Sequence, residues 1–310
     1  MTDASISPLE PLRSSRPRAT ARGSLPAWVT TALPIVPIVA IVLIAILAPI
    51  IAPYDPRTAV GASNLPPSAA HLFGTDGVGL DVFSRTVIGM QTSVRIGLIV
   101  VVLATVIGMI IGTFIGLAES KRGALGLLGR ALNRVSDYII SVPAIVLGIV
   151  VVGLMGTSDV TLVLALTLFL VQAPIRLTRV EVLRVRKEAY LDAARMAGES
   201  SARIAFSHVL PNSMRPALAN APLVFGNSII ILASLGFLGI GVQPPTPEWG
   251  VMISEGISPL MIGFWWGTVF PSVFLFLTVL GVSYSARSLP RFLTAVRGAY
   301  RARTRKAGNA

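Results

Sequence analysis

Residues 95–118 read RIGLIVVVLATVIGMIIGTFIGLA, a run in which only the first residue is charged. A helix that crosses a bilayer needs about 20 predominantly apolar residues, because every backbone amide must be paired within the hydrocarbon. This run is long enough, and it lacks the regular alternation of polar residues that marks amphipathic elements of soluble proteins. It therefore predicts a transmembrane helix.

Five further runs have the same character, at 28–52, 135–155, 160–177, 217–240 and 261–284. The 310-residue chain is 53% hydrophobic and 13% charged, and its mean hydropathy is +0.76. Soluble domains carry roughly 25% charged residues. We therefore predict an all-α membrane protein with six transmembrane helices.

The positive residues predict the orientation of these helices. If the six spans alternate in direction, 23 of the 26 Lys and Arg residues lie on one side. Positive loops stay in the cytoplasm, so both termini are expected there, in a multi-pass protein of the bacterial cytoplasmic (inner) membrane. On a soluble protein the net charge of +12 would suggest nucleic acid, but here orientation beside anionic lipid explains it, and no nucleic-acid partner is expected.

The same pattern divides the chain into segments. A tail rich in Pro, Ser and Arg is expected to be disordered, and it precedes the first span. The predicted segments are a disordered cytoplasmic tail (1–27), the first transmembrane helix (28–52), an extracytoplasmic segment (53–94), a five-helix core (95–289) with a cytoplasmic loop (178–216) and an extracytoplasmic loop (241–260), and a basic cytoplasmic tail (290–310).

The motifs of common catalytic sites are missing from the sequence. A Walker-type phosphate loop requires Gly directly before Lys, whereas Lys121, Lys187 and Lys306 follow Ser, Arg and Arg. The chain has no cysteine, and its two histidines, His71 and His208, are predicted on opposite sides of the membrane, so they cannot share a metal. We expect neither enzyme activity nor a cofactor or metal in this chain.

The interiors of the six predicted spans contain no acid or base. Ion-coupled carriers usually keep an ionisable residue deep in the bilayer, so the alternative, a secondary carrier or channel that works without an ATPase, is disfavoured. Polar residues remain in two spans, where they either bond neighbouring helices or line a translocation path. They are Gln172, Asn220, Asn227, Ser228 and Ser234.

Three glycines, Gly108, Gly112 and Gly116, recur every four residues and place a smooth strip on one face of the helix predicted over 95–118. Such a strip lets another helix approach closely. The spacing leaves open whether that helix belongs to this chain or to another.

Residues 188–212 read EAYLDAARMAGESSARIAFSHVLPN. A helix from about Leu183 is predicted to end at Gly198, which can adopt the left-handed conformation. Ser200 or Ser201 can cap a second short helix, and Pro211 is expected to end it. The pair predicts either a contact surface for a groove of another protein, with Ala193 and Ala194 as its slim face, or an ordinary amphipathic surface helix.

The spacing within this stretch resembles the EAA signature of binding-protein-dependent ABC importer permeases. Asp192-Ala193-Ala194 is followed at the signature's spacing by Gly198 and by Leu210-Pro211. Asp192 stands where Glu is usual, and His208 where an apolar residue is usual. The resemblance implies contact with an ATPase subunit through Glu188, Asp192, Ala193, Ala194, Arg195, Gly198, Leu210 and Pro211.

Two more stretches, HLFGTDGVGLDVFSR at 71–85 and LGIGVQPPTPEWG at 238–250, resemble dipeptide and oligopeptide permeases of the DppC/OppC type. Leu80 departs from that pattern, where Arg is frequent. The second stretch is expected to dock a binding protein or gate the pore, with a plain structural cap as the other interpretation. The residues concerned are Gln243, Pro244, Pro245 and Trp249.

The resemblance implies the fold of a type I ABC importer permease. It also implies a heterodimer with a homologous permease subunit, two ATPase domains that bind ATP and Mg, and an extracytoplasmic solute-binding protein. The implied function is ATP-coupled translocation of dipeptides, oligopeptides or related small solutes across the membrane.

Overall fold

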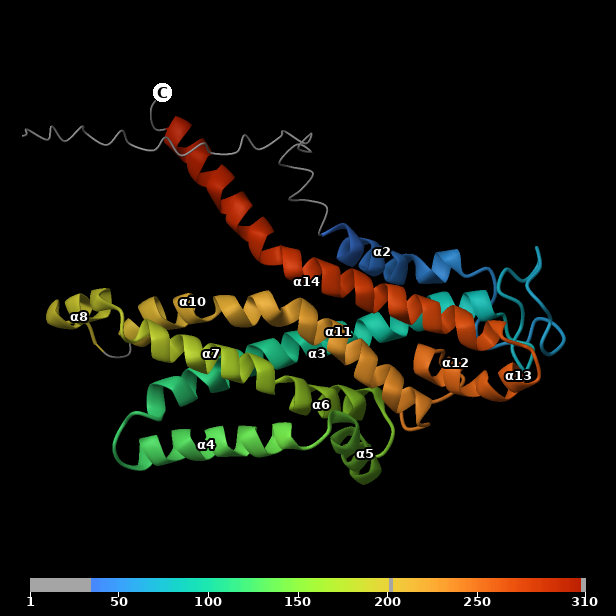
Figure 1. Cartoon of the computed structure of the whole chain (residues 1–310), viewed down its shortest axis with the longest axis horizontal. Coiled ribbons are helices and arrows are strands. Elements are labelled where there is room, and N and C mark those ends of the chain that lie inside the picture. Colours follow the sequence, from blue (N-terminus) through green and yellow to red (C-terminus); the bar gives the residue numbers. More distant parts are fainter. Residues whose placement is uncertain (1–34, 201–202, 308–310) are drawn as a thin grey trace, which may run out of the picture.

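A computed structural model describes residues 35–200 and 203–307, with the side chains of Arg195 and 287–307 outside the description. Every regular element in this part of the chain is a helix, apart from one isolated bridge between Thr75 and Asp81. The expected all-α class is confirmed for the described residues. The helices form an elongated bundle, with α8 at one end and α12 and α13 at the other (Figure 1).

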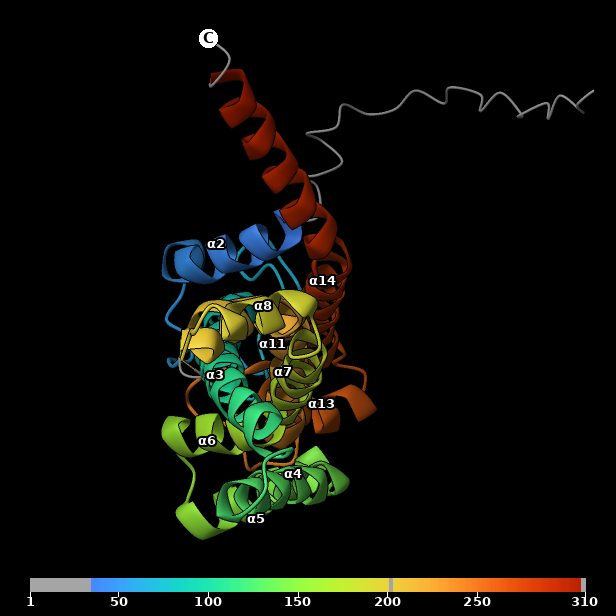
Figure 2. The same ribbon diagram turned by 90° about the vertical axis from the view of Figure 1, so that its left-hand side faces the viewer.

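In chain order, the helices of the described residues have the following bounds. They are α2 Val36–Ile51, α3 Val82–Ala118, α4 Ala124–Ser141, α5 Ala144–Met155, α6 Asp159–Leu170, α7 Gln172–Val185, α8 Ala189–Met196, the π-helix η1 Ile204–Val209, α10 Leu210–Ser213, α11 Arg215–Phe237, α12 Trp249–Glu255, α13 Ile257–Met261 and α14 Trp266–Ala307. Figure 2 shows α3, α7 and α11 at the centre, with α2 on one side and α4 and α5 on the other.

The glycine strip of α3 packs against α7 of the same chain, which answers the question that the spacing left open. A Cβ atom at Gly108 would lie 2.5 Å from the Pro174 side chain, and one at Gly112 would lie 2.5 Å from the Ile175 carbonyl oxygen. Any larger residue would push the two helices apart. The α3–α7 pair therefore forms the closely packed centre of the bundle.

Within the part of the chain that the structure describes, four helical segments are long and apolar enough to cross a membrane, and a bent pair raises that number to five. The four are Val82–Ala118, Asp159–Val185, Arg215–Phe237 and Trp266–Ala286. They correspond to the spans predicted over 95–118, 160–177, 217–240 and 261–284. Helix α2 falls in the run predicted over 28–52, but its described part has only 16 residues.

The prediction of a single helix over 135–155 is wrong. It is divided between α4 and α5, which are bent by 99°. The break lies at Pro143, whose ring excludes helical backbone at the preceding residue; Val142 is extended, with φ −84° and ψ 130°. The apolar composition continues across the break, which is why composition alone did not reveal it.

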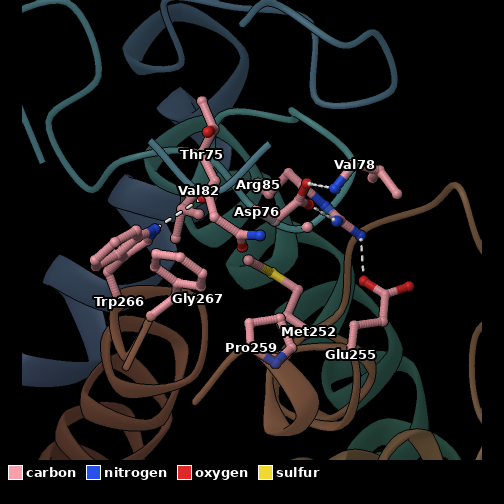
Figure 3. A pocket seen from close by; sticks show the side chains of 14 residues that line it. Thr75, Asp76, Val78, Val82, Arg85, Met252, Glu255, Pro259, Trp266 and Gly267 are labelled. Atoms are coloured by element: carbon pink, nitrogen blue, oxygen red, sulfur yellow. Dashed lines mark hydrogen bonds and ion pairs between the residues drawn. The ribbon is translucent and has the colours of Figure 1, made fainter. Parts of the chain in front are cut away.

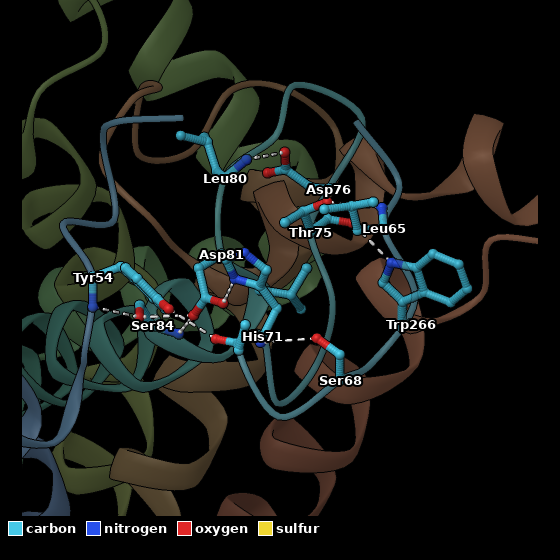
Figure 4. Close-up of polar contacts among 12 residues, drawn as sticks. Tyr54, Leu65, Ser68, His71, Thr75, Asp76, Leu80, Asp81, Ser84 and Trp266 are labelled. Carbon is cyan, nitrogen blue, oxygen red and sulfur yellow. Dashed lines mark hydrogen bonds and ion pairs between the residues drawn. The ribbon is translucent and has the colours of Figure 1, made fainter. Parts of the chain in front are cut away.

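The start of α3 was also misplaced, because this helix begins at Val82 rather than near Arg95. Asp81 caps it by accepting a hydrogen bond from the Ser84 N–H at 2.8 Å, and its other oxygen lies 2.9 Å from His71 Nδ1 (Figure 4). His71 and Asp81 of the 71–85 stretch thus hold this loop against the first turn of α3.

Candidate functional site

The stretch that resembles the EAA signature folds as two short helices at one end of the bundle. Helix α8 is followed by a turn in which Gly198 has φ +80°, and the Glu199 N–H bonds the Ala194 carbonyl at 3.1 Å. That bond is the six-to-one contact of a Schellman motif. The prediction that Gly198 ends a helix is confirmed, and Ser200 accepts from the Arg203 N–H at 3.3 Å, whereas Ser201 lies outside the described residues.

Two other expectations about this stretch are wrong. The helix does not begin near Leu183, because α7 ends at Val185 and a turn separates it from α8. Pro211 does not end the second helix either. The chain passes from η1 directly into α10, where Pro211 occupies the first turn and needs no N–H. The wider π-helical ring, in which the Leu210 N–H bonds the Ala205 carbonyl, accommodates this proline.

A small apolar core fixes the helix pair to the rest of the bundle. Leu191, Ile204 and Val209 are buried against Val182 and Val185 of α7. Since Leu191 holds one face of α8 inward, the opposite face lies at the surface of the bundle.

That outer face contains several of the predicted contact residues. Asp192, Ala193 and Gly198 are exposed, as are Glu188 and Pro211, whereas Ala194 and Leu210 are half-buried. Only Ala193 of the alanine pair is therefore on the surface. Met196, one turn after Asp192 and Ala193 in α8, is 83% exposed and adds an apolar side chain to this face. Phe206 of η1 is 71% exposed. The side chain of Arg195 lies outside the described residues.

Sequence reasoning missed a polar contact that braces the pair. His208 Nε2 lies 3.0 Å from Glu199 Oε2, and the His208 ring meets the ring of Tyr190 edge to face. The contact joins the turn after Gly198 to η1 across the angle between the helices. The signal was the histidine itself, which departs from the apolar residue usual at that position.

A second group of contacts joins this end of α7 to α3. Arg186 Nη1 donates to the Gly116 carbonyl at 2.8 Å and to Ser120 Oγ at 2.6 Å. Arg179 Nε donates to Glu119 at 2.8 Å. The end of α7 against which the helix pair packs is therefore joined to the end of α3 by charged hydrogen bonds.

The polar residues predicted within spans divide into two groups. Asn220, Asn227 and Ser234 recur every seven residues on α11, so they share one face. Asn227 is exposed, and the other two are half-buried. Gln172 and Ser228 instead are buried, and they donate to the carbonyls of Leu168 and Phe225. The first three therefore lie along one face of α11, although Ser234 also donates to a nearby main-chain carbonyl, that of Ile230, at 2.8 Å.

The PPTPEWG stretch lies at the far end of the bundle. Gln243, Pro244 and Pro245 are exposed there. Trp249 is fully buried, and its Nε1–H donates to the Thr86 carbonyl at 2.9 Å, which favours the structural interpretation of this residue. Trp249 joins α12 to α3, and only the residues before it remain available to a docking protein.

Glu248, which sequence reasoning did not select, is also fully buried. Its Oε2 caps α12 by accepting from the Val251 N–H at 3.1 Å, and Gly236 of α11 leaves the space that the carboxyl fills. Burial raises the pKa of the Glu248 carboxyl, although hydrogen bonds from the first turn of α12 oppose that shift. The described residues contain no group of His, Asp and Glu suited to a metal.

Comparison with known proteins agrees with this geometry. Residues 104–294 match the family described as the inner membrane component of binding-protein-dependent transport systems. The matched range contains the α3–α7 centre, the helix pair and α11. The chain belongs to this family of inner-membrane permeases.

Three similar proteins are permeases of peptide or glutathione transport systems. The chain is 36% identical over 257 residues to the probable D,D-dipeptide transport system permease protein DdpC of Escherichia coli, covering 83% of each chain. It is 35% identical to the di/tripeptide transport system permease protein DppC of Pseudomonas aeruginosa, over 77% of this chain and 79% of that one. It is 37% identical to the glutathione transport system permease protein GsiD of Pectobacterium atrosepticum, over 76% and 77%.

Proposed function

We propose that this protein is the permease subunit of an ATP-binding-cassette importer for dipeptides, oligopeptides or related small solutes. The observation that carries the proposal is the helix pair at 188–211, which presents Ala193 and Met196 outward and is anchored inward to α3 and α7. The family match and the peptide and glutathione permeases among the relatives support the same assignment.

The proposed complex contains four kinds of component. This chain pairs with a homologous permease subunit, two ATPase domains contact the helix pair, and an extracytoplasmic binding protein delivers the solute. ATP and Mg are bound by the ATPases, since this sequence has no Walker lysine. ATPase closure moves the helix pair, and the α3–α7 centre moves with it as a rigid body.

The proposed topology keeps six membrane crossings and cytoplasmic termini. The crossings are α2, α3, the bent pair α4 and α5, the pair α6 and α7, α11, and α14. Helix α5 has 12 residues and a length of about 18 Å, too short to cross alone, so the end of α4 completes the third crossing and leaves Arg130 and Arg134 toward the cytoplasm. This arrangement puts the helix pair on one side of the membrane and the 71–85 and 243–249 stretches on the other, and their places at opposite ends of the bundle support it (Figure 1).

The proposed translocation path follows the polar face of α11. Asn220, Asn227 and Ser234 succeed one another along its length, and the described part of this chain leaves Asn227 exposed. A second permease subunit facing this surface would enclose a path lined by uncharged polar groups. Amides and hydroxyls of this kind suit the peptide bonds of a solute.

Reconstitution of the complex in liposomes tests the proposal. Uptake of a radiolabelled dipeptide should require this chain, its permease partner, the ATPases, the binding protein and enclosed ATP, and it should vanish when any one is omitted. Uptake by the lone chain without ATP would refute the proposal in favour of a secondary carrier or channel.

A further inference from the structure

A cavity outside the proposed path lies at the end of the bundle that carries α12 and α13. Its volume is about 280 Å³. Four separate parts of the chain enclose it: the 64–78 loop, the first turns of α3, the α12–α13 segment and the start of α14 (Figure 3). The cavity is therefore a product of the tertiary fold rather than a gap within one loop.

One wall of the cavity is ionic. The Arg85 side chain is 3% exposed and bridges two carboxylates: Nη1 donates to Asp76, and Nη2 donates to Glu255 Oε2 at 3.0 Å. Asp76 makes two further hydrogen bonds, because its Oδ1 accepts from the N–H groups of Val78 and Leu80 at 3.0 and 2.9 Å. These three charges leave the wall with one negative charge in excess.

Glu255 is the group in this wall that can serve a ligand. A carboxylate has about four acceptor sites, and the described contacts of Glu255 use one, from Arg85. Its side chain is 40% exposed, whereas that of Asp76 is 16% exposed.

The remaining walls are mostly apolar. In Figure 3 the labelled apolar side chains lie beside and below the ionic wall. The apolar residues are Val82, Met252, Pro259, Phe264 and Trp266. Trp266 is held in place by a hydrogen bond from its Nε1–H to the Thr75 carbonyl at 2.8 Å. A preformed apolar cavity with a few placed polar groups is the usual form of a small-molecule site.

We propose that this cavity binds a protonated primary amine carried on a compact apolar body, with the ammonium group on Glu255 and the body between Met252, Phe264 and Trp266. The excess negative charge favours a cation over an anion, and the apolar walls favour an aliphatic or aromatic body over a bare ion. The amino terminus of a peptide and the headgroup of an aminolipid both have this ammonium chemistry.

Binding is tested on the full chain with its permease partner in nanodiscs, using L-leucinamide as the probe and calorimetry as the measurement. N-acetyl-L-leucinamide has the same body without the charge, and it should bind at least about tenfold more weakly. E255Q should weaken leucinamide binding by a similar factor. The matched control D159N removes another carboxylate that pairs with an arginine, Arg95, and it should change nothing.

A second variant keeps the test independent of the ion pairs. G267L places a side chain where a Cβ meets no atom within 4 Å, in the lining of the cavity. It should abolish leucinamide binding while the protein remains folded. The inference is overturned if leucinamide does not bind the parent complex, if the acetylated probe binds equally well, or if both E255Q and G267L bind like the parent.

Lipid composition distinguishes the two sources of the amine. If an aminolipid occupies the cavity, phosphatidylethanolamine nanodiscs should weaken leucinamide binding relative to phosphatidylglycerol nanodiscs. Equal binding in both assigns the site to a soluble amine such as a peptide terminus. None of these measurements requires transport, so failure of ATP-driven uptake and failure of this inference are distinguishable.

Discussion

Substitution of Gly198 separates a role in coupling from a role in stability. Gly198 has φ +80°, and a Cβ atom there would meet nothing within 4 Å. The penalty of G198A is therefore purely conformational, about 1–2 kcal/mol for an L-residue in the left-handed region. A penalty of this size lowers the population of the left-handed turn relative to other backbone conformations by about 5- to 30-fold. In those other conformations the bond from the Glu199 N–H to the Ala194 carbonyl is lost.

Gly156 provides a matched control. It has φ +81°, its Cβ would also meet nothing within 4 Å, and it lies between α5 and α6, far from the helix pair in sequence. G156A should therefore lose the same conformational energy as G198A. If the turn at Gly198 transmits ATPase motion, peptide uptake should fall by up to about 5- to 30-fold in G198A and remain near normal in G156A.

The assay is ATP-driven dipeptide uptake in liposomes, with membrane insertion measured in parallel. G198P removes the positive φ altogether, since proline fixes φ near −65°, and it should insert normally but transport nothing while ATP hydrolysis continues uncoupled. Normal uptake by G198P, or equal losses in G198A and G156A, would refute the coupling role.

Three further predictions concern the contacts that support this arrangement. R186M removes the donors to Gly116 and Ser120, so it should reduce uptake without blocking membrane insertion. The control R184M removes only exposed ion pairs with Glu181 and Glu188, so its uptake should stay normal. Equal uptake in the two variants would contradict this prediction. W249F should lower the free energy of unfolding by about 1–3 kcal/mol, because the bond to Thr86 is lost, and thermal melting should show a smaller change for W265F, whose ring is 45% exposed. The raised pKa of Glu248 means that the folded state binds this proton more tightly than the unfolded state does. The free energy of unfolding should therefore be highest below pH 4.5, the ordinary pKa of the carboxyl, and decrease as pH rises toward the folded-state pKa. Melting curves of E248Q should lack this pH dependence, and an unchanged pH dependence would exclude Glu248 as its source.

Much of the fold was accessible to sequence reasoning because lipid imposes one simple requirement, a long run of apolar residues. The runs at 95–118 and 217–240 contained helices for that reason, and Gly198 was recognisable because few other residues tolerate a positive φ. The 99° bend at Pro143 was not found, because the apolar run continues through it and the proline signal is local.

The site could be predicted only in part. Residue spacing identified the helix pair, since a helix end and a cap are local features. The burial of Trp249 could not be inferred, because an aromatic residue beside prolines has the same composition in a core and at an interface. The bridge from Arg85 to Glu255 joins residues 170 positions apart, and no local pattern reports such a contact.

Site-specific cross-linking tests the central claim, that energy enters this protein through the helix pair. The chain has no cysteine, so M196C is a unique attachment point on a residue that is 83% exposed, and L154C on α5, 82% exposed, is the control. With a photoactivated cross-linker and the assembled complex, M196C should yield an adduct with the ATPase subunit whose amount changes on ATP addition, and L154C should yield none. No ATPase adduct from M196C, or the same adduct from L154C, would contradict the account.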